Sequence, residues 1–196
     1  MQITRIVNSV FNSNSYILSD DNYPYCWLVD VGDVNAIIEF IGNREVKGVF
    51  LTHTHYDHIY GINKLIEQFP ETIVYTSIYG KEGLLSDKLN FSRYHLDPII
   101  FRGEHIKILE EGNVIFLFPF VELKVMYTPG HDWSCMCYYT DKFIFTGDSY
   151  IPNIKVITSM PKSNKEQAKE SLSRIRELIK TRDVYPGHND CVINSL

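Results

Sequence analysis

LTHTHYDHIYG, residues 51–61, is the stretch that decides the fold. It places three histidines and an aspartate within the six positions 53–58. The apolar run GVFL, residues 48–51, leads into it and is apolar enough to be a strand buried on both faces. So many nitrogen and oxygen donors directly after a buried strand indicate a functional site at the end of that strand.

Three further segments combine a predicted strand end with glycine and a histidine or aspartate. They are YTPGH at 127–131, FTGDS at 145–149 and YPGH at 185–188. The chain has seven histidines, and all except His95 and His105 lie in these segments or in residues 51–58. Glycine before a histidine allows a sharp turn and a close approach of the backbone to a crowded site. We therefore expect the four segments to meet.

The donor types predict a metal site. Imidazole and carboxylate without thiolate suit zinc, iron or manganese with open positions for water. Side chains alternate along an extended segment, so we expect His53, His55 and Asp57 to point the same way. His58 then comes round where the chain turns into a helix near Ile59. The candidate ligands are His53, His55, Asp57, His58, His131, Asp148 and His188. Seven ligands are too many for one tetrahedral ion but suit two ions that share a bridging carboxylate.

Around these segments, short strands alternate with helices, which predicts an α/β layered architecture in one domain, residues 1–196. Strands are expected at 3–7, 15–18, 26–31, 46–51, 72–76, 114–118, 121–128, 135–140, 142–146 and 184–185. Helices are expected at 34–41, 59–69, 78–85 and 163–180. Asp33 could cap the first helix, and Ser163 with Glu166 would form a capping box at the last. Residues 86–105 lack periodicity and are expected to form a long irregular loop, of the kind that often serves as a lid or as a wall of a substrate pocket.

Composition narrows the class of protein. The hydrophobic fraction of 44% and charged fraction of 22% are typical of a globular protein. The net charge is −5 and no cluster of lysine and arginine occurs, which argues against a nucleic-acid partner. No signal peptide and no apolar run long enough for a membrane helix is evident, so we expect a cytoplasmic protein. Four cysteines, Cys26, Cys135, Cys137 and Cys191, are expected to be buried thiols.

The motifs resemble those of the metallo-β-lactamase superfamily over almost the whole chain. The matching residues are the H-x-H-x-D-H pattern at 53–58, TPGH ending in His131, Gly-Asp at Asp148 and PGH ending in His188, in that order. The resemblance implies a four-layer αβ/βα sandwich with metal ions between its two sheets. It also implies that His53, His55 and His131 hold the first metal, that Asp57, His58 and His188 hold the second, and that Asp148 bridges both.

Within the superfamily, LNFS at 89–92 resembles a short stretch of glyoxalase II-like hydrolases. After His131 those enzymes usually continue Thr-Pro-Gly-Ser, whereas this chain continues Asp132-Trp133-Ser134. The activity implied is hydrolysis of a small ester, thioester or lactone by a hydroxide that bridges two divalent cations, Zn²⁺ first and Fe or Mn as alternatives. Asp57 is the candidate catalytic residue, which would orient the nucleophile and pass its proton to the leaving group.

Two other functions stay open. A phosphodiesterase or nuclease would use the same ligands, although the acidic balance counts against it. The second open function is that of a non-haem iron redox enzyme, such as a persulfide dioxygenase. A small molecule is the expected partner, and the sequence does not indicate the oligomeric state. Phe91, Tyr94, Trp133 and Tyr150 could line the substrate pocket, although packing is their simpler interpretation.

Overall fold

Two β-sheets lie face to face in the computed structural model, which describes residues 1–194. The first sheet has the strand order β1-β2-β3-β4-β5-β6. Its strands are β1 (Gln2–Val7), β2 (Asn14–Ser19), β3 (Tyr25–Val29), β4 (Glu45–Phe50), β5 (Ile73–Thr76) and β6 (Ile106–Ile108). The first three pair antiparallel, and β3 to β6 pair parallel.

The second sheet has the order β11-β10-β9-β8-β7. Its strands are β7 (Val114–Phe118), β8 (Val121–Tyr127), β9 (Met136–Tyr139), β10 (Phe143–Gly147) and β11 (Asp183–Pro186). The helices are α1 (Val34–Ile41), α2 (Tyr56–Ile59), α3 (Ile62–Gln68), α4 (Ile78–Leu84) and α5 (Lys165–Leu178). Only β10 and β11 pair parallel in this sheet, and α5 connects them.

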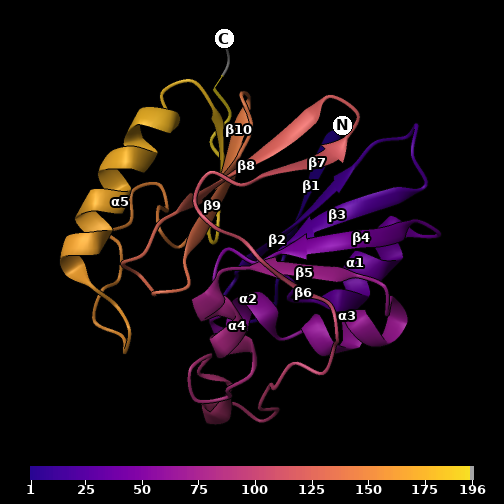
Figure 1. Cartoon of the computed structure of the whole chain (residues 1–196), viewed down its shortest axis with the longest axis horizontal. Coiled ribbons are helices and arrows are strands. Elements are labelled where there is room, and N and C mark those ends of the chain that lie inside the picture. The colour runs from indigo at the N-terminus through magenta and orange to yellow at the C-terminus, as the bar shows by residue number, and fades with distance from the viewer. Residues whose placement is uncertain (195–196) are drawn as a thin grey trace.

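Three apolar cores divide the molecule into four layers. Neighbouring residues of β4 show why, since side chains alternate along a strand. Val49 packs with α1 and α3 on the outer face, whereas Phe50 packs between the two sheets. Ile175 of α5 packs on the far side of the second sheet, against Ile144. Figure 1 shows α1 and α3 along the first sheet and α5 along the second. The predicted αβ/βα sandwich is confirmed.

The predicted helix at 59–69 is wrong in its bounds. The chain forms two helices instead, α2 and α3, separated at Tyr60 and Gly61. Gly61 lies against the Gly32 carbonyl, and a Cβ there would come within 2.2 Å of the Gly32 oxygen. The backbone N–H of Gly61 donates to Val31 rather than continuing a helix. Tertiary packing therefore interrupts a segment whose spacing alone favours one helix.

The predicted caps also differ. Asn164 is the N-cap of α5, and its side chain accepts from the N–H groups of Glu166 and Gln167. Ser163 instead donates its hydroxyl to the carbonyl of His131. Asp33 precedes α1 without capping it, because its carboxylate accepts from Ser9 and other groups outside the helix. No helix in residues 1–194 is both long and apolar enough to cross a bilayer.

The segment 86–105 is an ordered loop with one short 3₁₀ turn, Ser92–Tyr94. The buried Asn90 organises it, since its side-chain amide donates to the carbonyls of Gly83 and Ile99 at 3.0 and 2.9 Å. The backbone then turns through Phe91 in the left-handed region, with φ of 62°. This anchoring fixes where the loop stands beside the donor-rich segments.

Candidate metal centre

The four donor-rich segments meet where strands of both sheets end. A backbone hydrogen bond from Gly187 N–H to the Gly147 carbonyl, at 2.9 Å, joins the end of β11 to the end of β10. Another, from Met136 N–H to the Thr52 carbonyl at 2.7 Å, joins the start of β9 to the chain after β4. His131, in the chain after β8, lies with His53 and His55. The predicted meeting of the segments is therefore seen in the structure.

Glycine serves this site mainly by close approach, as the sequence suggested. A Cβ on Gly187 would lie 2.2 Å from Asp148 Oδ1 and 3.0 Å from His58 Cε1. Gly147 has φ of +49°, and a Cβ at this position would lie 2.6 Å from the Thr52 side chain. There is therefore no space for a side chain at Gly147 either. A larger residue at 187 would displace the candidate ligands Asp148 and His58, and one at 147 would displace Thr52.

The seven predicted donors form three overlapping groups, each compact enough to hold one metal ion. Within a group, one ligand atom from each residue lies within 4.8 Å of the others. The groups are His53, His55 and His131; His53, His58 and Asp148; and Asp57, His58 and His188. The groups contain no cysteine, and Cys26, Cys135 and Cys137 are buried free thiols.

One sequence expectation about the first motif is wrong. Asp57 lies with His58 and His188, not with His53 and His55. The extended backbone ends at His55, with φ of −64° and ψ of 148°, and α2 begins at Tyr56. Side chains of a helix follow a period of 3.6 rather than 2, so Asp57 turns toward the other group.

Several buried donor atoms in the cluster have no hydrogen-bond partner among residues 1–194. They include His53 Nε2 and Asp148 Oδ1. Other donor atoms face each other closely, with His131 Nε2 3.0 Å from His55 Nδ1 and His58 Nε2 3.3 Å from His188 Nε2. Buried polar atoms without partners are costly, and opposed imidazole nitrogens are satisfied by a shared cation. The residues therefore fit a bound metal.

Backbone carbonyls fix the imidazole tautomers that such binding needs. His131 Nδ1 lies 3.0 Å from the Ile157 carbonyl, and His188 Nδ1 lies 3.1 Å from the Phe11 carbonyl. A carbonyl only accepts, so Nδ1 carries the proton in both rings. The lone pair of the neutral ring is then on Nε2, which faces the cluster.

Asp30 performs the same task for two more histidines, and sequence reasoning missed it. Its buried carboxylate accepts from Thr52 N–H at 2.8 Å, from Thr52 Oγ1 at 2.7 Å and from His58 Nδ1 at 2.9 Å. Since the Thr52 hydroxyl donates to Asp30, it accepts from His53 Nδ1, 3.2 Å away. The Nε2 atoms of His53 and His58 therefore carry no proton in the neutral rings and are free to bind a metal. The sequence feature that could have indicated this role is that Asp30 is a carboxylate at the end of a buried strand.

The charges of the cluster favour a cation. Burial lowers the pKa of His53 well below its ordinary value, and the neighbouring imidazoles lower it further, so this ring is neutral. Burial alone would raise the pKa of Asp148, but the imidazoles of His58, His188 and His131 together outweigh it and lower the pKa to about 2. Burial opposes protonation of His188, yet hydrogen bonds to Asp148 and Asp57 raise its pKa to about 9. Cation binding would therefore displace protons.

Aromatic rings border the cluster on the side of the 86–105 loop. The ring of Phe91 meets His55 edge to face, with centroids 4.9 Å apart. His95 stacks on Tyr56 at 3.8 Å, and Phe11 meets His95 at 5.9 Å. Two other aromatic residues expected near the substrate have different neighbours. The ring of Trp133 stacks on Tyr79, and Tyr150 lines a separate cavity.

Comparison with known proteins identifies the family. Residues 8–188 match the Metallo-beta-lactamase superfamily, and the chain belongs to it. The metal-ligand clusters and the family together support binding of divalent metal.

Solved structures share the fold. The BLEG-1 B3 metallo-beta-lactamase is 23% identical, with a TM-score of 0.84 over 97% of this chain and 93% of that one. A di-iron-bound form of TTHA1623 is 22% identical, with a TM-score of 0.79 over 97% and 94% of the two chains. ETHE1 from Myxococcus xanthus is 22% identical, with a TM-score of 0.75 over 97% and 76%. At this identity the likeness shows the fold alone.

Proposed function

We propose that the protein is a binuclear metal-dependent hydrolase that acts on a small ester, thioester or lactone. The observation that carries the proposal is the set of three overlapping donor groups built from seven buried or half-buried side chains. Such a set is larger than one ion needs. The absence of a thiolate among these groups suits Zn²⁺ with open positions for water.

The two ions would have separate ligands and one shared carboxylate. His53, His55 and His131 would hold the first, and Asp57, His58 and His188 the second. Asp148 would contact both, because Oδ2 lies 3.5 Å from His131 Nε2 and from His188 Nε2, while Oδ1 lies 3.5 Å from His58 Nε2. Two divalent cations bound there would lower the pKa of water and polarise the carbonyl group of the substrate, whose carbon is attacked.

The chain's own residues would position the water and receive its proton. Asp57 Oδ2 lies 3.2 Å from His188 Nε2, on the more open side of the cluster, where the two side chains are 13% and 18% exposed. As a carboxylate it accepts a hydrogen bond from the attacking water and transfers the proton to the leaving group. Phe91 and Phe11 offer an apolar wall to the substrate's acyl group.

A substrate panel tests the proposal. Zinc-loaded protein should hydrolyse an aryl ester, an acyl thioester or a lactone, and lose the activity after chelation. His188→Gln should lower turnover at least 100-fold, while His105→Gln, an exposed histidine outside the cluster, should change nothing. Cleavage of bis(p-nitrophenyl) phosphate or of nucleic acid without ester hydrolysis would instead establish a phosphodiesterase.

A non-haem iron redox enzyme, such as a persulfide dioxygenase, is the second candidate. The donor set accepts iron as well as zinc, and the similar structure of TTHA1623 is di-iron-bound. Iron in the purified protein, with oxygen consumption on a persulfide and no hydrolysis of the panel, would favour this function over the first.

A further inference from the structure

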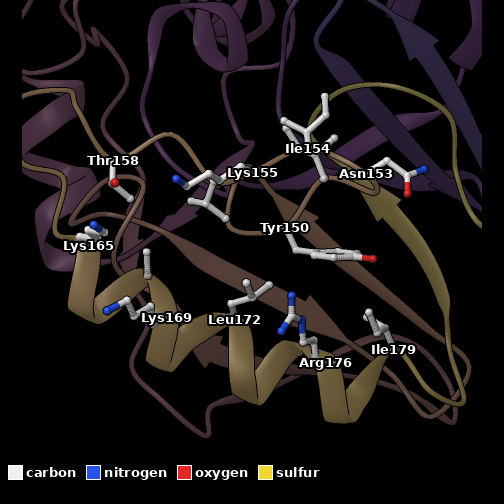
Figure 2. A pocket seen from close by; sticks show the side chains of 13 residues that line it. Tyr150, Asn153, Ile154, Lys155, Thr158, Lys165, Lys169, Leu172, Arg176 and Ile179 are labelled. Atoms are coloured by element: carbon white, nitrogen blue, oxygen red, sulfur yellow. The ribbon is translucent and has the colours of Figure 1, made fainter.

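A second cavity lies between α5 and the loop 150–158. Its volume is about 520 Å³, within the range of small-molecule sites. Figure 2 shows Leu172 and Arg176 of α5 on one side, with Ile154 and Lys155 of the loop on the other. The ring of Tyr150 lies between these two sides. The metal-ligand groups do not include any residue that lines the cavity.

The floor of the cavity is apolar. Ile175 of α5 is fully buried against the second sheet, but Leu172 and Ile179, on the neighbouring stripe, are only partly covered. On the opposite side Ile154 is 45% exposed. Apolar side chains left open inside a concave site are typical of ligand-binding pockets.

The residues that line the cavity carry an excess of positive charge. The cavity is lined by four cations, Lys155, Lys165, Lys169 and Arg176, and by no carboxylate. The net charge of the protein is −5, so the positive charge at the cavity is opposite in sign to the charge of the whole protein. Among the described residues, only Lys169 of the four has an ion pair, with Glu166 at 2.8 Å, and both side chains are exposed. Lys165, Lys169 and Arg176 lie along one face of α5.

The cavity is separate from the metal centre. The segment 151–157 lies between the cavity and the metal centre. The Ile157 carbonyl accepts a hydrogen bond from His131, whereas Ile154 and Lys155 face the cavity. Between the cavity and the metal centre is a space of about 20 Å³ that is lined by His131 and Asp148 and also by Ile151, Ile154, Lys155 and Val156, which line the cavity as well. This space has room for about one water molecule, so an organic ligand in the cavity would not pass through it to the metal ligands.

We propose that this cavity is a second ligand site, for a small amphipathic anion. The apolar part of the ligand would lie on Leu172, Ile179 and Ile154, and its carboxylate, phosphate or sulfonate would lie among the lysines and Arg176. The proposal is independent of the reaction at the metal centre, since it depends on none of the metal ligands.

Titration calorimetry of the zinc-loaded protein tests it with 1-octanesulfonate, whose sulfonate is a weak metal ligand. We expect saturable binding, and no binding of octyltrimethylammonium, which has the same chain and the opposite charge. Lys155→Gln and Arg176→Gln should each weaken binding about twofold to fivefold, as expected for loss of one exposed charge interaction. Lys180→Gln, an exposed cation beyond α5 that does not line the cavity, is the matched control.

Backbone amide shifts in NMR spectra locate the ligand. Residues 154, 172 and 176 should shift on titration, while residues 53 and 55 should not. Octanoate and octyl phosphate then distinguish the two natural head groups by their relative affinity. Equal affinity of all variants, binding of the cationic amphiphile, or shifts confined to the metal centre would overturn the proposal.

Discussion

Asp30→Asn should weaken zinc binding although Asp30 is not among the candidate ligands. The carboxylate accepts three hydrogen bonds and so determines which nitrogen of His58 carries the proton. Through the Thr52 hydroxyl it does the same for His53. Asparagine fits the backbone, since Asp30 has φ of 57° and asparagine tolerates this region. Its amide, however, has one accepting oxygen and one donating nitrogen.

The expected loss of zinc affinity depends on which hydrogen bond of Asp30 is lost. If the amide oxygen keeps the bond from the Thr52 backbone, the amide nitrogen faces His58 and donates to Nδ1. The neutral ring must then carry its proton on Nε2, the atom that faces the cluster. Loss of such a partner costs about 10- to 100-fold in metal affinity, or about 1.4 to 2.8 kcal/mol.

Competition against a chromophoric chelator measures the zinc affinity of the variant directly. Circular dichroism and thermal unfolding should verify that the variant is folded before affinity is compared. Asp33→Asn is the matched control, because its carboxylate also accepts from Ser9 and Tyr60 but lies outside the metal-ligand groups. A folded Asp30→Asn protein that binds zinc as tightly as the native chain would refute the reasoning.

Three other perturbations follow from the structure. Gly187→Ala should reduce zinc stoichiometry and lower stability by about 1 to 3 kcal/mol, because its Cβ would lie 2.2 Å from Asp148 Oδ1; unchanged metal content and melting temperature would contradict this. Asn90→Ala should cost about 1 to 3 kcal/mol in urea unfolding, since two carbonyls lose a buried donor. Asn90→Ala should also raise KM, because the loop then positions Phe91 less firmly beside the cluster. A wild-type unfolding free energy together with a wild-type KM would contradict an anchoring role for Asn90. Zinc addition near neutral pH should release protons, because His188, with its pKa raised to about 9, is protonated without metal. Zinc affinity should accordingly fall as pH is lowered, and calorimetry in two buffers of different ionisation enthalpy should detect the release; identical heats would argue against it.

The sequence predicted much of this architecture because donor residues follow strand ends. His131, Asp148 and His188 each come after a strand that alternation and turn residues mark. Residues buried on both faces, such as Val49 and Phe50, also make β4 recognisable as a central strand. The layer order then follows from which strands have helices after them.

What the sequence did not predict depends on contacts between distant segments. The start of α2 at Tyr56 turns Asp57 away from His55, and local alternation carries no information about that start. Asp30 acts through bonds to Thr52 and His58, which are 22 and 28 residues away along the chain. The cationic cavity likewise combines a helix with a loop that has no periodic pattern.

Metal analysis of protein purified without added metal tests the central claim most directly. Elemental analysis should give about two zinc ions per chain, and His53→Gln should contain less metal than the native protein. Iron in place of zinc would favour the redox function on the same ligands. Less than one metal ion of any kind per chain, with no uptake when zinc is titrated into the native protein, would contradict a metal centre at these residues.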